Sequence, residues 1–393
     1  MNKFLKINFK YIFYMIIALV FVKPRYFEEF QILDILFNVF RIIFSCVILM
    51  EYLIKNKYKV SKYFILWSIF YIILIGTTIW HRTDILRSIM FMLCGLSIIS
   101  IIEMSIKDKN LYRIDAFYIS YFIMVLINFI CLVIFPKGLY VQAGDRGCFL
   151  NIDNLLGHIL LLNIMLATIN ISNKRFSIIS KLNVILCVLT IIITWSATAV
   201  VALLVFFILL LLKSSKTLSK IINCNNLLII YGVFFFILIL NGNSSLFNTI
   251  ITNVLKKDLT FSGRTFVWNE FFNYINNGYI NIIIGNGIKV LNTIYVSHFG
   301  VNVHLHNQFY NVIYEGGLCA LFIFVLIILN STKKLERTKT NNKTISIITA
   351  ALFSFLMFMT MEINRDLEYL IFVFTIAYYV EDIIRLLKNT NTA

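Results

Sequence analysis

LNVILCVLTIIITWSATAVVALLVFFILLLL, residues 182–212, is an apolar run of thirty-one residues that lies between Lys181 and Lys213. About twenty apolar residues span a bilayer as a helix, so this run is too long for one untilted span. Two short helices that turn near Trp195 and Ser196 would return the chain to the side on which the run began. A single helix would instead place every later loop on the opposite side.

The basic residues favour the two-helix interpretation. Cytoplasmic loops of membrane proteins carry an excess of Lys and Arg. With two helices in the run, 23 of the 35 Lys and Arg residues fall in loops on one side, and residues 331–343, which hold five of them, form one of these loops. The pattern then predicts twelve spans with both termini cytoplasmic, near residues 11–22, 31–54, 63–80, 85–106, 114–135, 152–171, 182–196, 197–212, 226–240, 308–330, 344–362 and 367–384.

The composition indicates a multi-pass membrane protein. Of the 393 residues, 60% are hydrophobic and 14% charged, and the mean hydropathy is +0.86, whereas a soluble domain needs more polar surface. We therefore predict an all-α membrane protein with about twelve transmembrane helices, one domain over residues 1–393 and a large extracytoplasmic loop over residues 241–305. The net charge of +16 follows from cytoplasmic loops and contact with membrane lipid, so no nucleic-acid partner is expected.

Cysteines and histidines form no ligand pattern. The seven cysteines lie mostly inside the predicted spans without paired spacing, and the five histidines are scattered. They predict neither a disulfide framework nor a metal site. No cofactor is expected.

Polar residues repeat along one face of the second predicted span. Asp34, Asn38, Arg41 and Ser45 follow one another at intervals of four, three and four residues. Two interpretations remain open. The side chains hydrogen-bond to a neighbouring helix, or they line a hydrated cleft that an anionic head group enters, in which case Arg41 is the binding residue.

A candidate anion site precedes the sixth predicted span. Residues 144–147 predict a turn, and Asn151 or Asp153 can cap the helix that follows. Arg146 would then lie beside a helix N-terminus, where the amides and the guanidinium both attract an anion. A surface salt bridge between Arg146 and Asp145 is the alternative.

The motif SGRTFVW, residues 262–268, predicts the start of a helix within the large loop. Ser262 is a suitable N-cap for a helix over residues 264–276. Its apolar face contains Trp268, Phe271, Phe272 and Ile275. Arg264 falls in the first turn, where a positive charge opposes the helix dipole by roughly 0.3–1 kcal/mol. This position suits an anion bound between the arginine and the helix amides.

The motif HLHNQFYNVIYEGG, residues 304–317, opens the tenth predicted span. A helix from His306 onward has one face made up of Asn307, Asn311, Tyr314, Glu315 and Leu318. His306 lies beside this face at the mouth of the span and can accept or supply a proton near neutral pH, although a structural histidine is the alternative. Glu315 can orient His306, act as a base itself or pair with an arginine. The asparagines suit the hydroxyls of a sugar.

Together, SGRTFVW, the apolar stretch that ends in GNG at residues 285–287, and HNQFYNVIYEGGLCA resemble the signature region of the O-antigen ligase and Wzy-type polysaccharide polymerase superfamily. His306, Asn307 and Gly317 match its pattern in register, whereas Ala320 departs from it.

This resemblance implies a GT-C-like, inverting, metal-independent glycosyltransferase of the bacterial cytoplasmic membrane. Its substrate would be an oligosaccharide linked to a polyprenyl lipid such as undecaprenol through pyrophosphate, and it would act at the outer face. The departure at Ala320 and the Ile-, Asn- and Lys-rich composition favour a polymerase of capsule or O-antigen repeat units. A ligase that uses another acceptor is one alternative, and a flippase or exporter of the same lipid-linked oligosaccharide is another. Flippase and chain-length regulator proteins would be partners.

Roles for individual residues follow. Arg264 and, second to it, Arg146 are expected to stabilise the departing pyrophosphate. His306 is the expected catalytic base, with Glu315 next. Substrate binding is expected of Asn307, Trp268 and Arg41.

Overall fold

The computed structural model describes residues 9–142, 145–214, 222–240, 263–289, 292–338, 343–364 and 367–391. Its α-helices are α1 (Phe9–Phe21), α2 (Gln31–Lys55), α3 (Lys62–Trp80), α4 (Ile85–Lys107), α5 (Tyr112–Ile134), α6 (Leu156–Ser172), α7 (Ser177–Thr194), α8 (Ala197–Ser214), α10 (Cys224–Leu240), α12 (Arg264–Asn276), α13 (Gln308–Arg337), α14 (Lys343–Met361), α15 (Glu368–Tyr378) and α16 (Val380–Asn391). The 3₁₀ helices are η1 (Arg25–Glu29) and η2 (Asp153–Leu155). Two antiparallel hairpins pair β1 (Tyr140–Gln142) with β2 (Asp145–Gly147) and β3 (Thr293–Val296) with β4 (Val301–His304).

Eight of the described helices are long and apolar enough to cross a bilayer, and four further apolar helices are shorter. The predicted all-α membrane fold is therefore confirmed, whereas the count of twelve spans is not. The prediction of one span over residues 367–384 is wrong, because two helices, α15 and α16, cover this region. Polar residues such as Glu381 and Arg385 lie exposed on α16 and suit a surface helix better than a continued span. The side of the membrane that each terminus faces stays a prediction.

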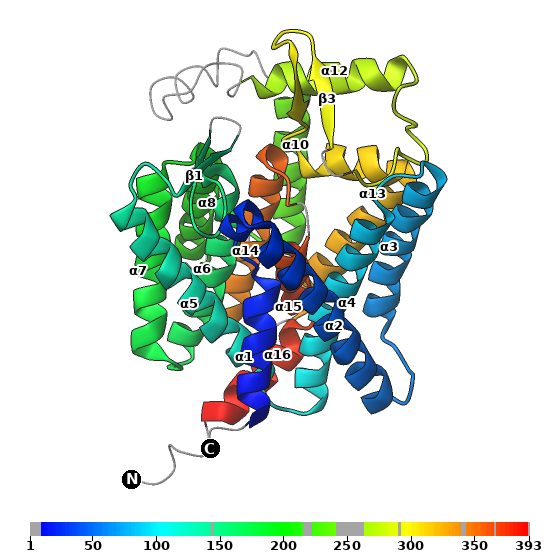
Figure 1. Cartoon of the computed structure of the whole chain (residues 1–393). Helices are drawn as coiled ribbons and strands as arrows, with labels where there is room; N and C mark the ends of the chain where they lie inside the picture. Colours follow the sequence, from blue (N-terminus) through cyan, green and yellow to red (C-terminus); the bar gives the residue numbers. More distant parts are fainter. Residues whose placement is uncertain are drawn as a thin grey trace.

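The apolar run at residues 182–212 contains the predicted turn. α7 ends at Thr194 and α8 begins at Ala197. Between them Trp195 adopts a left-handed backbone conformation, with φ 50° and ψ 37°, which a continuous right-handed helix cannot contain. α7 packs on α6 and α8 packs on α14, so both helices join the bundle (Figure 1).

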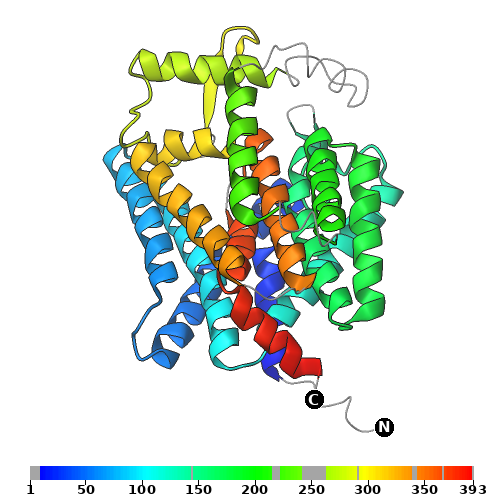
Figure 2. The ribbon, with the colours of Figure 1, turned by 180° about the vertical axis from the view of Figure 1, so that it is seen from behind.

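The helices form a bundle that is covered at one end. In Figure 1, α2, α3 and α4 stand at one side, α5, α6, α7 and α8 stand at the other, and α14 and α15 lie between them; Figure 2 shows the arrangement from behind. α14 contacts α8, α6, α13 and α15 and so fills the centre of the bundle. α12 and the β3–β4 hairpin, which are the described elements of the predicted large loop, lie across one end.

The GNG motif docks against a break in α13. Gly317 is non-helical, with φ 65° and ψ −166°, so the first part of α13 lies across the covered end and the remainder descends through the bundle (Figures 1 and 2). The N–H of Gly287 donates to the carbonyl of Glu315 at 3.0 Å. A Cβ at Gly317 would lie 2.1 Å from the carbonyl oxygen of Ile283, so only glycine fits. Leu318 is exposed beyond the break, which corrects the prediction that it shares a face with Glu315.

α12 has the predicted bounds and anchors the covering elements through aromatic packing. Ser262, the predicted N-cap, lies outside the described residues. Trp268 and Phe271 are buried against Tyr310 of α13, and the rings of Phe271 and Tyr310 stack with centroids 4.7 Å apart. Phe272 is exposed, so the apolar face is narrower than predicted. This small core fixes α12 and the β3–β4 hairpin on the start of α13.

Candidate functional site

A buried glutamate joins two of the predicted site residues. Glu362 directly follows α14. Its carboxylate accepts one hydrogen bond from Nη2 of Arg264, at the start of α12, and another at 3.1 Å from Nδ1 of His306, which precedes α13. Three segments that are far apart in the sequence therefore meet at one carboxylate.

The backbone at His306 departs from the predicted helix. His306 has a φ of 46°, and α13 begins two residues later with Asn307 as its N-cap, so the prediction of a helix from residue 306 onward is wrong. The side-chain oxygen of Asn307 accepts from two backbone N–H groups of the first turn, at 2.9 and 3.2 Å. Its Nδ2 donates to the carbonyl of Thr360 at 3.1 Å and so ties the start of α13 to the end of α14. Asn307 is fully buried, and it holds the segments that carry His306 and Glu362.

The carboxylate determines which nitrogen of His306 carries a proton. An ionised carboxylate only accepts hydrogen bonds, so Nδ1 is the protonated nitrogen of the neutral ring and Nε2 carries the lone pair. The His306 side chain is partly exposed, whereas Glu362 is buried. This arrangement suits a base, because Nε2 can take up a proton and the charge of Glu362 then stabilises the imidazolium.

Glu362 is ionised although it is buried. Burial raises the pKa of its carboxyl, but the charge of Arg264, the charge of His306 when its ring is protonated and the hydrogen bond from His306 outweigh burial and hold the pKa below its ordinary value. The three side chains are therefore one electrostatic unit. A change in the charge of one side chain therefore changes the electrostatic energy of the other two.

His306 and Glu362 line a cavity of about 480 Å³, here called the histidine cavity. The rest of its lining consists of Arg25, Asp145, Ile152, Asn154, Leu155, Asn292, Thr293, Val301, Asn302, Val303, His304, Asn311 and Ile363. Several amides and a hydroxyl face this space, which suits a ligand rich in hydroxyl groups. Within the described ranges, no group of three or more His, Cys, Asp and Glu side chains is placed to hold a metal ion.

Asp145 of β2 adds a second carboxyl to the histidine cavity. Nδ2 of Asn154 donates to it at 3.4 Å. Burial, and after it the negative charge of Glu362, raise the pKa of Asp145. The cavity therefore contains one carboxyl whose pKa is lowered, Glu362, and another whose pKa is raised, Asp145.

Glu315 has a different partner from the one predicted. It accepts a hydrogen bond from Nδ2 of Asn292, which also donates to Oδ1 of Asn311 at 3.0 Å. Both amides line the histidine cavity, whereas Glu315 is not among its lining residues. Glu362, and not Glu315, orients His306. The prediction that Glu315 orients His306 is therefore wrong.

Arg146 lies in the β1–β2 hairpin, next to Asp145, and contacts other segments. Its Nε donates to Asp153 at 2.9 Å, Nη1 to the carbonyl of Pro136 at 2.7 Å and Nη2 to the carbonyl of Ile193 at 3.2 Å. The predicted alternative was a salt bridge from Arg146 to Asp145. Arg146 instead forms its salt bridge with Asp153. These contacts attach the hairpin to the ends of α5 and α7.

The local structure around Arg146 differs from the prediction in two further ways. Of the predicted turn at residues 144–147, Gly144 lies outside the described residues and the other three form β2. Neither Asn151 nor Asp153 caps a helix: η2 and α6 begin without a side-chain cap, because the Asp153 carboxylate binds Arg146.

Trp268 is buried in the packing between α12 and α13. Its indole N–H donates to the carbonyl of Leu305 at 3.1 Å. This bond supports the segment that leads to His306. The placement favours a structural role for Trp268 over stacking on a sugar.

Arg41 lies at a second cavity of about 380 Å³, here called the lysine cavity. It forms a buried ion pair with Glu368 at the start of α15. The last member of the polar stripe on α2, Ser45, donates to Sγ of Cys94 on α4 at 3.5 Å, as the first interpretation predicts. The first three members line this cavity, and binding of an anionic head group by Arg41 stays a prediction.

Sequence reasoning did not select Glu362 and Asp145. The sequence signal for Glu362 is a charged residue at the end of the apolar run at 344–361, and the signal for Asp145 is its place next to Arg146. Neither signal predicts which residues Glu362 and Asp145 contact, because their contacts join segments that are distant in the sequence.

Comparison with known proteins finds a family match over part of the chain. Residues 182–325 match the family model described as O-Antigen ligase. No curated protein and no solved structure matches the chain. The matched segment includes Arg264, His306 and Glu315, whereas Arg41, Arg146 and Glu362 lie outside it. The predicted resemblance is therefore confirmed over this segment.

Proposed function

Because residues 182–325 form an O-antigen ligase family domain, we propose that this membrane protein is a polysaccharide polymerase. It joins polyprenyl-pyrophosphate-linked oligosaccharide repeat units of a capsule or an O-antigen at the outer face of the bacterial cytoplasmic membrane. The transfer is inverting and needs no metal. Flippase and chain-length regulator proteins are its proposed partners.

The observation that carries this proposal is the carboxylate shared by a cation and a base. Glu362 holds Arg264 and His306 together, and His306 faces a polar cavity of about 480 Å³. Glycosyl transfer from a pyrophosphate needs these two functions side by side. A cation must stabilise the leaving group, and a base must accept a proton from the acceptor.

The proposed step is a single displacement. The acceptor hydroxyl oxygen attacks the anomeric carbon of the donor from the face opposite the pyrophosphate, and a glycosidic bond forms while the carbon–oxygen bond to the pyrophosphate breaks. The hydroxyl proton passes to Nε2 of His306. The bonding electrons leave with the pyrophosphate, whose charge Arg264 stabilises through its planar guanidinium.

The remaining polar groups of the histidine cavity support this step. Glu362 stabilises the imidazolium that forms and fixes the position of the Arg264 guanidinium. The amides of Asn292, Asn302 and Asn311 bind sugar hydroxyls.

Purified protein in proteoliposomes, supplied with the lipid-linked repeat unit, provides the test. Wild-type protein should lengthen the glycan into a ladder that electrophoresis resolves. His306→Ala and Arg264→Ala should each reduce the rate by about 10²-fold or more, because each removes a group that acts on the transition state.

Matched controls are His81→Ala and Arg385→Ala, which change exposed residues outside both cavities. They should leave the rate unchanged. Full activity in His306→Ala or Arg264→Ala, with protein that remains monodisperse, would overturn the assignment.

Transfer to another acceptor is the second candidate function, because the matched family model is described as O-Antigen ligase. A ligase would move the glycan once onto an acceptor that carries no pyrophosphate. The same proteoliposomes distinguish the two. A single transfer to an added lipid acceptor, without a ladder from the repeat unit alone, would favour the ligase.

A further inference from the structure

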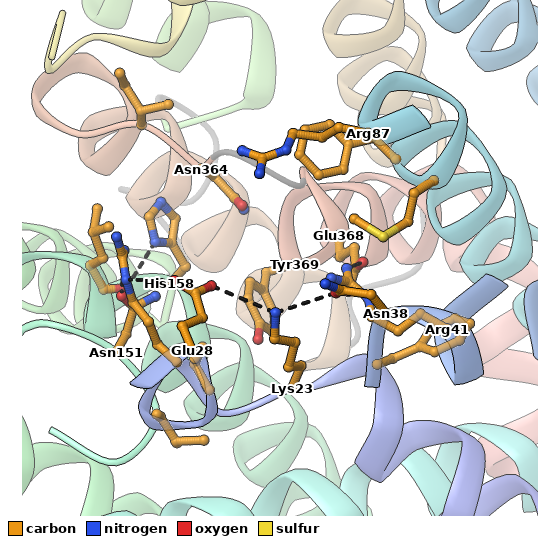
Figure 3. Close-up of a pocket in the computed structure, with 18 of the residues that line it drawn as sticks. Lys23, Glu28, Asn38, Arg41, Arg87, Asn151, His158, Asn364, Glu368 and Tyr369 are labelled. Carbon is orange, nitrogen blue, oxygen red and sulfur yellow. Dashed lines mark hydrogen bonds and ion pairs between the residues drawn. The ribbon is translucent and has the colours of Figure 1, made fainter. Parts of the chain in front are cut away.

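The lysine cavity lies beside the histidine cavity, and the two share Arg25, Leu155 and Ile363 as lining residues. Figure 3 shows the lysine cavity from close by: Lys23 and Arg87 reach into the space from opposite sides, with Asn364 and Tyr369 between them. Most of its wall comes from η1, α2, α4, α6, residues 150–151, residues 363–364 and the start of α15. A ligand in one cavity would therefore be separated from the other by a single layer of side chains.

The charged lining of the lysine cavity consists of four basic residues and three acidic ones. The basic residues are Lys23, Arg25, Arg41 and Arg87, and the acidic ones are Glu28, Asp34 and Glu368. Arg41 and Glu368 form a pair in which each side chain is 4% exposed, so they make a fixed, neutral part of the wall. The other basic residues are the groups that can respond to a ligand.

Lys23 and Arg25 lie deeper than the carboxylates that pair with them. Their side chains are 9% and 17% exposed, whereas Asp34 and Glu28 are 32% and 49% exposed. An entering anion can displace these carboxylates into water at low cost, because they already lie at the edge of the cavity.

Amide oxygens hold the two cations in place independently of the carboxylates. Nζ of Lys23 donates to Oδ1 of Asn38 at 3.3 Å, and Nη1 of Arg25 donates to Oδ1 of Asn151 at 3.1 Å. Arg87 enters from α4, where its Nε lies 3.1 Å from Asp84. Three cations from two directions thus surround one space, which suits a group with several negative oxygens.

The surroundings of the lysine cavity favour an anion that carries a lipid tail. α2, whose polar face lines the cavity, is a candidate membrane span. The other face of α2 is apolar and exposed, at Ile32, Ile35, Val39 and Ile43. A head group in the cavity can therefore continue into an apolar chain along the helices.

We propose that the lysine cavity binds the diphosphate of a second polyprenyl-diphosphate substrate, which is the glycosyl acceptor, while Arg264 binds the diphosphate of the donor. This inference rests on the proposed polymerase function, because joining two lipid-linked units requires two diphosphates on one chain. The sugar of the acceptor extends past Arg25 into the histidine cavity, where its hydroxyl meets His306. A ligase whose acceptor has no diphosphate does not need the lysine cavity.

Binding stoichiometry tests the proposal without requiring activity. The full chain in phosphatidylcholine nanodiscs is titrated with undecaprenyl diphosphate, and native mass spectrometry counts the bound molecules. We expect two per chain, one lost in Lys23→Gln combined with Arg87→Gln, and the other lost in Arg264→Gln. One molecule per wild-type chain, or two on the double variant, would overturn the proposal. Displacement of the second molecule by phosphatidylglycerol alone would also overturn it.

Kinetics separate the two sites. Loss of a charge-assisted hydrogen bond weakens binding by about tenfold or more, so Lys23→Gln should raise the KM for the lipid-linked acceptor by about that factor and change the KM for the donor much less. Lys23→Arg keeps the charge and should restore most of the acceptor affinity. Arg385→Gln is the matched control on an exposed surface. Equal effects of Lys23→Gln on donor and acceptor would contradict the proposal.

The two proposals fail in different ways. If the chain binds two diphosphates but forms no polymer, the proposed polymerase function is wrong and the second binding site remains. A chain that forms polymer but binds one diphosphate would keep the polymerase function and overturn the second site.

Discussion

Glu362 and Glu368 are two buried carboxylates, six residues apart in the sequence, that serve neighbouring cavities in different ways. Glu362 binds Arg264 and also the imidazole of His306, a group that can accept a proton in a reaction. Glu368 pairs with Arg41, which stays charged at any accessible pH. This difference shows that Glu362 suits a step in which a proton moves. Glu368 suits a part of the cavity wall that keeps a fixed shape.

The largest effect is expected from Glu362→Gln, which keeps the size of the side chain and removes its charge. The His306 imidazolium and the Arg264 guanidinium then lose their common partner, and kcat should fall by about 10²- to 10⁴-fold. Initial rates of chain lengthening in proteoliposomes measure this effect. An unchanged kcat would show that the shared carboxylate is not part of the reaction.

The same variant also tests the charge of Glu362 through the pH dependence of stability. The folded pKa lies below the ordinary value of 4.5, so the ionised carboxylate stabilises the fold above that pH, and this contribution is lost as the pH falls through the lowered value. The difference in Tm between wild type and Glu362→Gln should therefore be largest at neutral pH and shrink in acid. A difference that is independent of pH would contradict an ionised Glu362.

Glu368→Gln should act mainly on stability. Breaking a buried ion pair costs about 3–5 kcal/mol, because the remaining charge loses its partner away from water. Unfolding in detergent measures the loss, and the double variant Arg41→Met with Glu368→Leu should recover most of it. If well-folded Glu368→Gln protein lost as much kcat as Glu362→Gln, the contrast between the two carboxylates would be wrong.

The smallest effect is expected from Asp145→Asn. The folded pKa of Asp145 is raised by burial and by Glu362, so its ionised form destabilises the fold at neutral pH. The variant should be slightly more stable, by less than about 1 kcal/mol because solvent screens this partly exposed group. The gain should shrink as the pH falls through the raised pKa and vanish below the ordinary value of 3.8. Thermal unfolding across this pH range measures it, and a loss of stability at neutral pH would contradict the repulsion.

Local patterns predicted several features correctly. The excess length of the run at 182–212 and its flanking basic residues predicted the turn at Trp195, and the apolar spacing after Arg264 predicted the bounds of α12. The glycines at 285–287 and Gly317 were recognised as a motif. Their physical reason, a backbone contact between two segments, became visible only in the structure.

Partners across the sequence were not predictable in the same way. A salt bridge from Arg146 to Asp145 was one alternative, and Arg146 contacts Asp153 and two backbone carbonyls instead. Anion binding by Arg146 stays a prediction. Orienting His306 was one of three roles considered for Glu315, and Glu362 contacts His306 from another helix end. In each case the partner lies in a segment that the sequence pattern did not point to.

The sequence by itself determined that this chain is a helical membrane protein and where its apolar run turns, and it singled out Arg264 and His306 as candidates. Hydropathy, chain reversal and motif spacing are local properties, which can be read without knowing what packs against them. The tertiary structure alone decided that Glu362 holds both Arg264, 98 positions away, and His306, 56 positions away. A buried carboxylate takes as partners the cations that helix packing brings within reach, and that packing depends on the whole chain.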